Sequence, residues 1–219
     1  MILTVKPSLE LHGSIQLPSS KSYSIRASMI ASCGGKSFIK NYSDCNDASV
    51  ALLAAKFLGA KVKKLNQTNY RITAATSNPQ ISKINVQESG TVLRFILPLI
   101  ALQGQKAIVT GEGTLKGRPN KFLIETLRKM GSHLHGVGAH ESIPIKFLGG
   151  HLLGGTIEID GSLSSQFISA LLIACPILKE DTHLRLKGKN LVSTDYITMT
   201  LNVLEKSQIK IRQKNRNNI

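Results

Sequence analysis

The chain has 219 residues, enough for one large domain or two small ones, and 42% of them are hydrophobic, which supports a real core. Its 28 Lys and Arg against 13 Asp and Glu give a formal charge of +15, which favours an anionic partner such as a phosphorylated metabolite, a nucleic acid or an acidic surface. Three isolated cysteines argue against a disulfide framework, and the start of the sequence lacks a signal-peptide layout. The longest apolar stretch (95–102) is too short to span a bilayer. We therefore expect a cytoplasmic protein.

The first predicted helix begins within the segment PSSKSYSIR (18–26), where hydroxyl side chains flank a lysine. Ser22 and Arg26 are four residues apart and therefore share a helix face. A helix N-terminus adds free backbone N–H groups and a positive dipole end, so Lys21, Ser22 and Arg26 suit a phosphate or a carboxylate. The alternative is that Ser20 is an ordinary N-cap and that both cations are solvated.

The same pattern occurs twice more along the chain. Ser89 and Ser164 each open another aliphatic helix, at offsets of 69 and 75 residues, and a second helix follows in each copy. We therefore predict an α/β fold of three repeated β-α-β-α-β-β units, with apolar helices buried inside and sheets outside. The predicted helices span 20–35, 46–62, 89–105, 117–134, 164–180 and 193–211, and the predicted strands span 36–42, 61–65, 69–74, 106–111, 133–137, 143–147, 156–160 and 182–188.

The ends of the second helices carry a further signal. Gly59 and Gly131 stand where a glycine with positive φ terminates a helix. Gln208 stands there in the third copy, so it must either adopt a left-handed conformation at some cost or end the helix by another cap. After 209–211 the sequence becomes basic and the expected last hairpin is missing, which indicates a chain cut inside its third repeat.

The second copy places a glycine and two arginines at its helix starts. Gly90 precedes the first helix and permits close approach of a ligand to the backbone, and Arg94 lies one turn further on. Arg118 lies in the loop before the second helix and is expected to project toward the side of Gly90, with Pro119 in the first helical turn. The alternative is a Gly-Thr turn with ordinary loop cations.

The third copy offers hydroxyl and amide groups instead of charge. Ser164, Ser165 and Gln166 open its first helix, and Ser193 opens its second, with Tyr196 three residues later. Such groups bind a phosphate or sugar-like hydroxyls by hydrogen bonding, although two serine N-caps and a packed tyrosine are the simpler alternative for this copy alone. A single serine cap is common, but chance alone would much more rarely place all three sites at equivalent helix starts. The six histidines lack metal-ligand spacing, and neither a P-loop nor a dinucleotide motif is present.

From 17 to 211 the chain resembles 5-enolpyruvylshikimate-3-phosphate (EPSP) synthases in LPSSKSYSIRA, SGTVLRF, LKGRP, DGSLSSQFISALL and LVSTDYITMTLNVL. The resemblance implies that the 5-hydroxyl of shikimate 3-phosphate adds to C2 of phosphoenolpyruvate and that phosphate then leaves, without a cofactor. It implies that Lys21 is catalytic, that shikimate 3-phosphate contacts Lys21, Ser22, Arg26, Ser164, Ser165, Gln166, Ser193 and Tyr196, and that phosphoenolpyruvate contacts Lys21, Gly90, Arg118 and Gln166.

The same resemblance implies a particular domain organisation. The family has two similar domains of about 200 residues each, with the active site between them. By this resemblance the chain is the N-terminal half of the enzyme and is expected to be inactive alone. The segment 1–18 would pair with the absent C-terminal domain. The segment 19–211 would form the substrate-binding domain, with a truncated third repeat, and the segment 212–219 would be a basic tail. The expected partners are the two small-molecule substrates and that missing domain, with no nucleic acid and no membrane, and a monomer is expected for the full-length enzyme.

Two positions depart from the family pattern. Glu88 stands where the family usually has Asn, and its carboxylate would repel phosphoenolpyruvate unless it is turned away or protonated. Thr194 and Asp195 replace a common Lys-Pro pair.

Two other functions compete with this interpretation. One is the related enolpyruvyl transferase acting on UDP-N-acetylglucosamine, which the Ser-Ser-Gln and VSTDY segments disfavour because they suit a small phosphorylated ring. The other is a non-catalytic basic nucleic-acid-binding module, which the scarcity of aromatic residues and the lack of a basic stripe along a helix disfavour.

Overall fold

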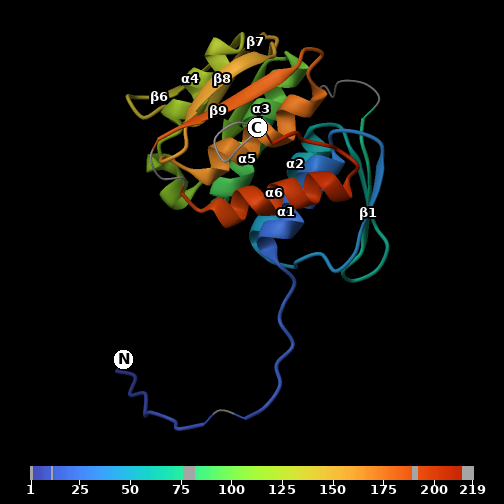
Figure 1. Cartoon of the computed structure of the whole chain (residues 1–219), viewed down its shortest axis with the longest axis vertical. Coiled ribbons are helices and arrows are strands. Elements are labelled where there is room, and N and C mark those ends of the chain that lie inside the picture. The colour runs from blue at the N-terminus through green and yellow to red at the C-terminus, as the bar shows by residue number, and fades with distance from the viewer. Residues whose placement is uncertain (1, 11, 76–81, 189–191, 214–219) are drawn as a thin grey trace.

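Apolar helices form the interior of the molecule and three small sheets lie on its outside (Figure 1). The computed structural model describes residues 2–10, 12–75, 82–188 and 192–213, and it confirms the predicted mixed α/β class. The segment before the first helix extends away from the folded part (Figure 1). The helices are α1 (Lys21–Ala31), α2 (Asn46–Phe57), α3 (Gly90–Gln103), α4 (Lys121–Lys129), α5 (Ser165–Ala174) and α6 (Thr194–Lys206), with 3-10 turns η1 (Gly113–Gly117) and η2 (Cys175–Ile177).

The sheets have the strand orders β1-β3-β2, β4-β5-β7-β6 and β8-β9. The antiparallel order β1-β3-β2 recurs as β5-β7-β6, and β4 runs parallel to β5 as β8 does to β9. These orders agree with a repeated unit, while the equivalence of three whole units stays a prediction. The strands are β1 (Lys36–Ile39), β2 (Lys61–Lys64), β3 (Tyr70–Thr73), β4 (Lys83–Asn85), β5 (Ala107–Thr110), β6 (Ser132–Val137), β7 (Ser142–Gly150), β8 (Gly155–Asp160) and β9 (Thr182–Lys187).

Helices α3 and α5 carry the core because they are apolar on nearly every face. Phe95, Leu97 and Ile100 of α3 have no exposed surface, and neither have Ile168 and Leu171 of α5. Burial of each such side chain stabilises the fold by roughly 1.5–3 kcal/mol. The two helices therefore hold their N-termini, which carry predicted site residues, on a rigid base.

Two details of the elements differ from the sequence-based prediction. Strand β4 was not expected, because its three residues contain only one buried apolar side chain, Ile84. Helix α4 begins at Lys121 with Asn120 as its N-cap, so Pro119 precedes the helix and the prediction of a first-turn proline is wrong. Asn120 has a non-helical backbone, and its N–H bonds the His140 carbonyl at 2.9 Å, so the helix begins only after it.

The helix ends follow the expected chemistry closely. Gly59 and Gly131 have φ values of +92° and +102°, which confirms their role in ending α2 and α4. Gln208 has a φ of +63°, so the third copy takes the left-handed conformation despite its side chain.

The cysteines are free thiols, and Cys33 and Cys175 pack against the core while keeping some exposure. Burial raises the pKa of each of these two thiols to about 12, so both are inert at neutral pH. Among the described residues, no helix has the length and the apolar character that a bilayer crossing requires.

Candidate functional site

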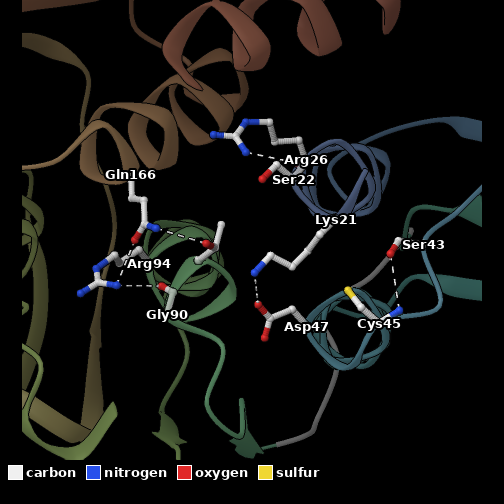
Figure 2. Close-up of polar contacts among 10 residues, drawn as sticks. Lys21, Ser22, Arg26, Ser43, Cys45, Asp47, Gly90, Arg94 and Gln166 are labelled. Carbon is white, nitrogen blue, oxygen red and sulfur yellow. Dashed lines mark hydrogen bonds and ion pairs between the residues drawn. The ribbon is translucent and has the colours of Figure 1, made fainter. Parts of the chain in front are cut away.

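Two of the three predicted sites come together where α3 and α5 begin (Figure 2). The Arg94 guanidinium Nη1 donates to the Gln166 Oε1 at 2.9 Å and to the Gly90 carbonyl at 3.1 Å. The Gln166 Nε2 donates to the Thr91 hydroxyl at 3.2 Å. Groups from the second and third copies are therefore joined by hydrogen bonds, although we predicted them from the sequence as two separate sites.

A second guanidinium reaches the same place from the loop before α4. A Cβ atom added at Gly90 would lie 2.7 Å from the Arg94 Nη1 and 3.0 Å from the Arg118 Nη1. This confirms the expectation that Arg118 projects toward the side of Gly90. Both cations thus contact the glycine closely because it has no side chain.

A cavity of about 590 Å³ opens beside these groups. Arg94 is only 8% exposed, and its burial, together with the nearby Arg118 charge, lowers its pKa to about 10, so it stays protonated at neutral pH. A small anion with an apolar part suits this lining, because cations and hydrophobic side chains face one space. One carboxylate, Glu125, also lines the cavity and lies 3.9 Å from the Lys121 ammonium. The lining residues are Arg94, Arg118, Pro119, Lys121, Phe122, Glu125, His140, Leu163, Ser164, Gln166 and Phe167. A larger cavity, about 790 Å³, lies between β9 and 210–212 and includes none of the predicted site residues.

Lys21 makes an ion pair that the sequence did not reveal. Its ammonium lies 3.0 Å from the Asp47 carboxylate, which stands in the first turn of α2 (Figure 2). The hydrogen bond and the charge of Asp47 raise the pKa of Lys21. Asp47 therefore contacts Lys21 of α1 as well as standing at the N-terminus of its own helix. The neighbouring Ser22 is half-buried.

Arg26 lies in the interior, where it joins α1 to α6. Its Nε donates to the Thr200 hydroxyl at 2.8 Å, its Nη1 to the Ser22 carbonyl at 3.2 Å and its Nη2 to the Tyr196 carbonyl at 3.2 Å. It also lies over the rings of Phe95 and Tyr196. The residue is 1% exposed, and burial lowers its pKa to about 10. The alternative of a solvated cation is therefore wrong for Arg26, whose guanidinium points away from Asp47 (Figure 2).

The serines of the third copy behave differently from one another. Ser164 is an ordinary N-cap whose hydroxyl accepts from the Gln166 N–H at 3.2 Å, and Ser165 is buried. Ser193 precedes α6 in a left-handed conformation, with a φ of +54°, and its side chain makes no capping bond. Tyr196 is half-exposed. A non-glycine residue with positive φ costs of order 1 kcal/mol, and the substrate contact expected of Ser193 stays a prediction.

The Glu88 carboxylate is bound by the turn before Arg118. Its Oε2 accepts from the Thr114 N–H at 3.2 Å, and the side chain lies against Gly113 in η1. The Thr114 hydroxyl in turn accepts from the Arg118 Nη2 at 3.4 Å, and the repulsion considered from the sequence stays a prediction. Among the residues that the structure describes, no group of three His, Cys, Asp or Glu could hold a metal ion.

A family model described as EPSP synthase (3-phosphoshikimate 1-carboxyvinyltransferase) matches residues 5–219. The chain is similar to the 3-phosphoshikimate 1-carboxyvinyltransferase of Methanococcoides burtonii, with 36% identity over 95% of this chain and 49% of that protein. The enzyme of the same name from Buchnera aphidicola has 36% identity over 95% of this chain and 49% of its own length. The fold also matches a solved EPSP synthase from Acinetobacter baumannii, with a TM-score of 0.79 and 20% identity over 94% of this chain and 46% of that one. The chain thus spans about half the length of these relatives.

Proposed function

Because the chain belongs to the EPSP synthase family, we propose that it supplies the shikimate 3-phosphate half-site of an enolpyruvyl transferase in chorismate and aromatic amino acid biosynthesis. The observation that supports this most strongly is the convergence of Arg94, Arg118 and Gln166 beside Gly90 at one cavity. Two guanidinium groups and an amide form a donor-rich site, which suits an anionic substrate.

In this proposal, residues at the three helix starts bind the two substrates. Shikimate 3-phosphate is bound by Lys21, Ser22 and Arg26 from the first copy and by hydroxyl and amide groups from the third. Phosphoenolpyruvate is bound by Lys21, Gly90, Arg118 and Gln166. The ion pair with Asp47 holds the Lys21 ammonium beside the N-terminus of α2, which supports its role as a positioned cation. The groups from the third copy are Ser164, Ser165, Gln166, Ser193 and Tyr196.

The chemistry is an addition followed by an elimination. The 5-hydroxyl oxygen of shikimate 3-phosphate forms a bond to C2 of phosphoenolpyruvate while C3 takes up a proton, and the hydroxyl loses its own proton. The C2–O bond to phosphate then breaks and C3 loses a proton, which restores the double bond. Cations beside the cavity stabilise the leaving phosphate.

We propose that a second domain completes this site and brings the proton-transfer groups. The chain spans about half of its relatives, and its first 18 residues would pair with that domain. We accordingly expect the 219-residue chain in the cytoplasm to bind shikimate 3-phosphate weakly and not to turn over alone. The full-length enzyme would be a monomer.

Thermal melting of the purified chain with millimolar shikimate 3-phosphate tests the proposal, with inorganic phosphate as the ligand control. A ligand stabilises only a folded state that it binds, so a rise in Tm specific to shikimate 3-phosphate is expected. Lys21→Met should reduce the rise, whereas Lys36→Met, on the exposed face of β1, should keep it. A cooperative melt without any shift would contradict a preformed half-site, and product formation by the chain alone would contradict its inactivity.

A further inference from the structure

One buried cation near the cavity has no role in the assignments made from the family pattern. Arg94 is 8% exposed, lines the cavity and contacts Gln166, which the proposed function places between the two substrates. Its Nε–H is buried and has no hydrogen-bond partner among the described residues. Its other contacts hold it firmly, since Nη1 also bonds the Gly90 carbonyl one turn earlier and the group lies 5.7 Å from the centre of the Phe167 ring.

The contact with Arg94 decides which way the Gln166 amide faces. A guanidinium has only donors, so its partner must be the amide oxygen of Gln166. The amide nitrogen consequently faces the other way, where one N–H bonds the Thr91 hydroxyl at 3.2 Å. No recorded bond in the described part of the chain uses its second N–H. The amide oxygen faces Arg94, whereas the second N–H on the other side of the amide can be donated to an oxygen acceptor of a ligand.

The packing around this pair is stiff enough to keep the orientation. The Phe167 ring beneath Arg94 stacks on Phe122 of α4, with the two ring centres 5.8 Å apart. Arg94 and Gln166 belong to α3 and α5, the two most buried helices. The amide is therefore held from two sides, by Arg94 and by Thr91, before any ligand arrives.

We propose that Arg94 is a positioning residue for the enolpyruvyl transfer site: it fixes the Gln166 amide so that an N–H faces an anionic or hydroxyl oxygen of the bound substrate. This inference rests on the proposed function for the identity of the substrate. The orientation of the amide itself can be tested without any ligand.

A double-mutant cycle on the full 219-residue chain tests the coupling. The dissociation constant of shikimate 3-phosphate is measured by calorimetry for wild type, Arg94→Met, Gln166→Ala and the double variant. Each single change is expected to weaken binding by about tenfold, and the double variant should be no weaker than the worse single variant, because Arg94 acts through Gln166. Multiplying effects, about 100-fold for the double variant, would overturn the proposal and indicate that Arg94 contacts the substrate itself.

The ligand-free readout is the NMR order parameter of the Gln166 side-chain amide. This order parameter is expected to be high in wild type and to fall in Arg94→Met toward the value of the exposed Gln67 side chain. Arg94→Lys should give an intermediate value, and this variant replaces Arg94→Met in the test if the Met variant fails to fold. Arg185→Met, on the exposed face of β9, is the matched control and should change nothing. An amide that stays equally ordered without Arg94 would overturn the proposal. If wild type fails to bind shikimate 3-phosphate but the amide loosens, the proposed function fails while the positioning role stands.

Discussion

The two arginines beside Gly90 make this glycine the most informative single position in the site. Its surroundings are full, since a Cβ atom would lie 2.7 Å from one guanidinium and 3.0 Å from the other. Both neighbours are the far ends of long side chains, of which Arg94 is the more firmly held, and Gly90 is in the first turn of α3 without a positive φ. A side chain here therefore displaces the cations and leaves the backbone undisturbed.

We predict that Gly90→Ala changes ligand recognition without harming the fold. Alanine has a higher helix propensity than glycine by up to about 1 kcal/mol, so the Tm should stay equal or rise slightly. Displacement of Arg94 and Arg118 should weaken phosphoenolpyruvate binding about tenfold or more in the enzyme that contains both domains, as steady-state kinetics would show.

The matched control is Gly117→Ala, because a Cβ atom at Gly117 meets open space. It should leave both stability and kinetics close to wild type. Equal phosphoenolpyruvate constants for Gly90→Ala and wild type would argue against the two guanidinium groups as the binding site.

At the scale of elements, the β6–β7 turn holds the loop that carries Arg118. The Asn120 Nδ2 donates to the Arg118 carbonyl at 3.1 Å and to the Glu141 carbonyl at 3.4 Å, and the Ser142 hydroxyl donates to the Arg118 carbonyl at 3.2 Å. Glu141 itself has a φ of +49° and pairs with Arg128 of α4 at 2.8 Å. Glu141 thus connects the turn to the loop through its backbone carbonyl and to α4 through its carboxylate.

We predict that Glu141→Gln destabilises the fold by about 1 kcal/mol at pH 7. Burial acts to raise the pKa of this carboxyl, but bonds from the Gly136 N–H and from Arg128 outweigh burial and hold the pKa below its usual 4.5. A lowered folded-state pKa means that the stabilisation exists above about pH 4.5 and is lost as the pH falls through the folded-state value.

Urea unfolding of both proteins between pH 7 and pH 3 measures this effect. The two stabilities should converge toward pH 3. Glu125→Gln is the control, since Glu125 meets Lys121 only at 3.9 Å on the surface and should cost almost nothing. A gap between Glu141→Gln and wild type that persists at pH 3 would mean that packing, and not charge, explains the loss.

The elements were largely predictable because their signals are local. Ser20 and Ser164 do cap α1 and α5, and Gly59 and Gly131 do end α2 and α4. Strand β4 escaped prediction because three residues with one buried side chain carry no usable period.

The contacts within the site were not predictable in the same way. Arg94 and Gln166 are 72 positions apart, and no pattern around either residue specifies the other. The same holds for Arg26 and Thr200, which are 174 positions apart. Sequence motifs located every helix start except that of α4 to within one residue, whereas the partners of the charged groups depend on how the helices pack.

At the scale of the whole molecule, the third sheet differs from the other two. It has only two strands, and within the described residues β9 pairs with β8 alone, whereas β5 has a neighbour on each side. Two-stranded sheets are marginal by themselves, so β8 and β9 depend on the buried side chains beneath them, such as Ile159 and Leu184.

We predict that hydrogen exchange separates these sheets. Amides of β5 should exchange slowly, and the amides of β9 that point away from β8 should exchange much faster, because no strand in the described part of the chain pairs with them. Exchange followed by mass spectrometry on the 219-residue chain measures both. Uniformly slow exchange across β9 would show that its edge is covered in solution. Size-exclusion chromatography at two protein concentrations would then test whether a second copy of the chain covers this edge.

The burial of Arg26 has a thermodynamic consequence for any ligand that reaches it. Three of its five N–H groups already bond within the described part of the chain, two of them to α6. The rotational freedom of this long side chain is therefore lost when the protein folds and is not lost again when a ligand binds. Recognition by the two remaining N–H groups would accordingly carry a smaller entropic penalty than recognition by the half-exposed Lys21, whose ammonium must exchange Asp47 for the ligand.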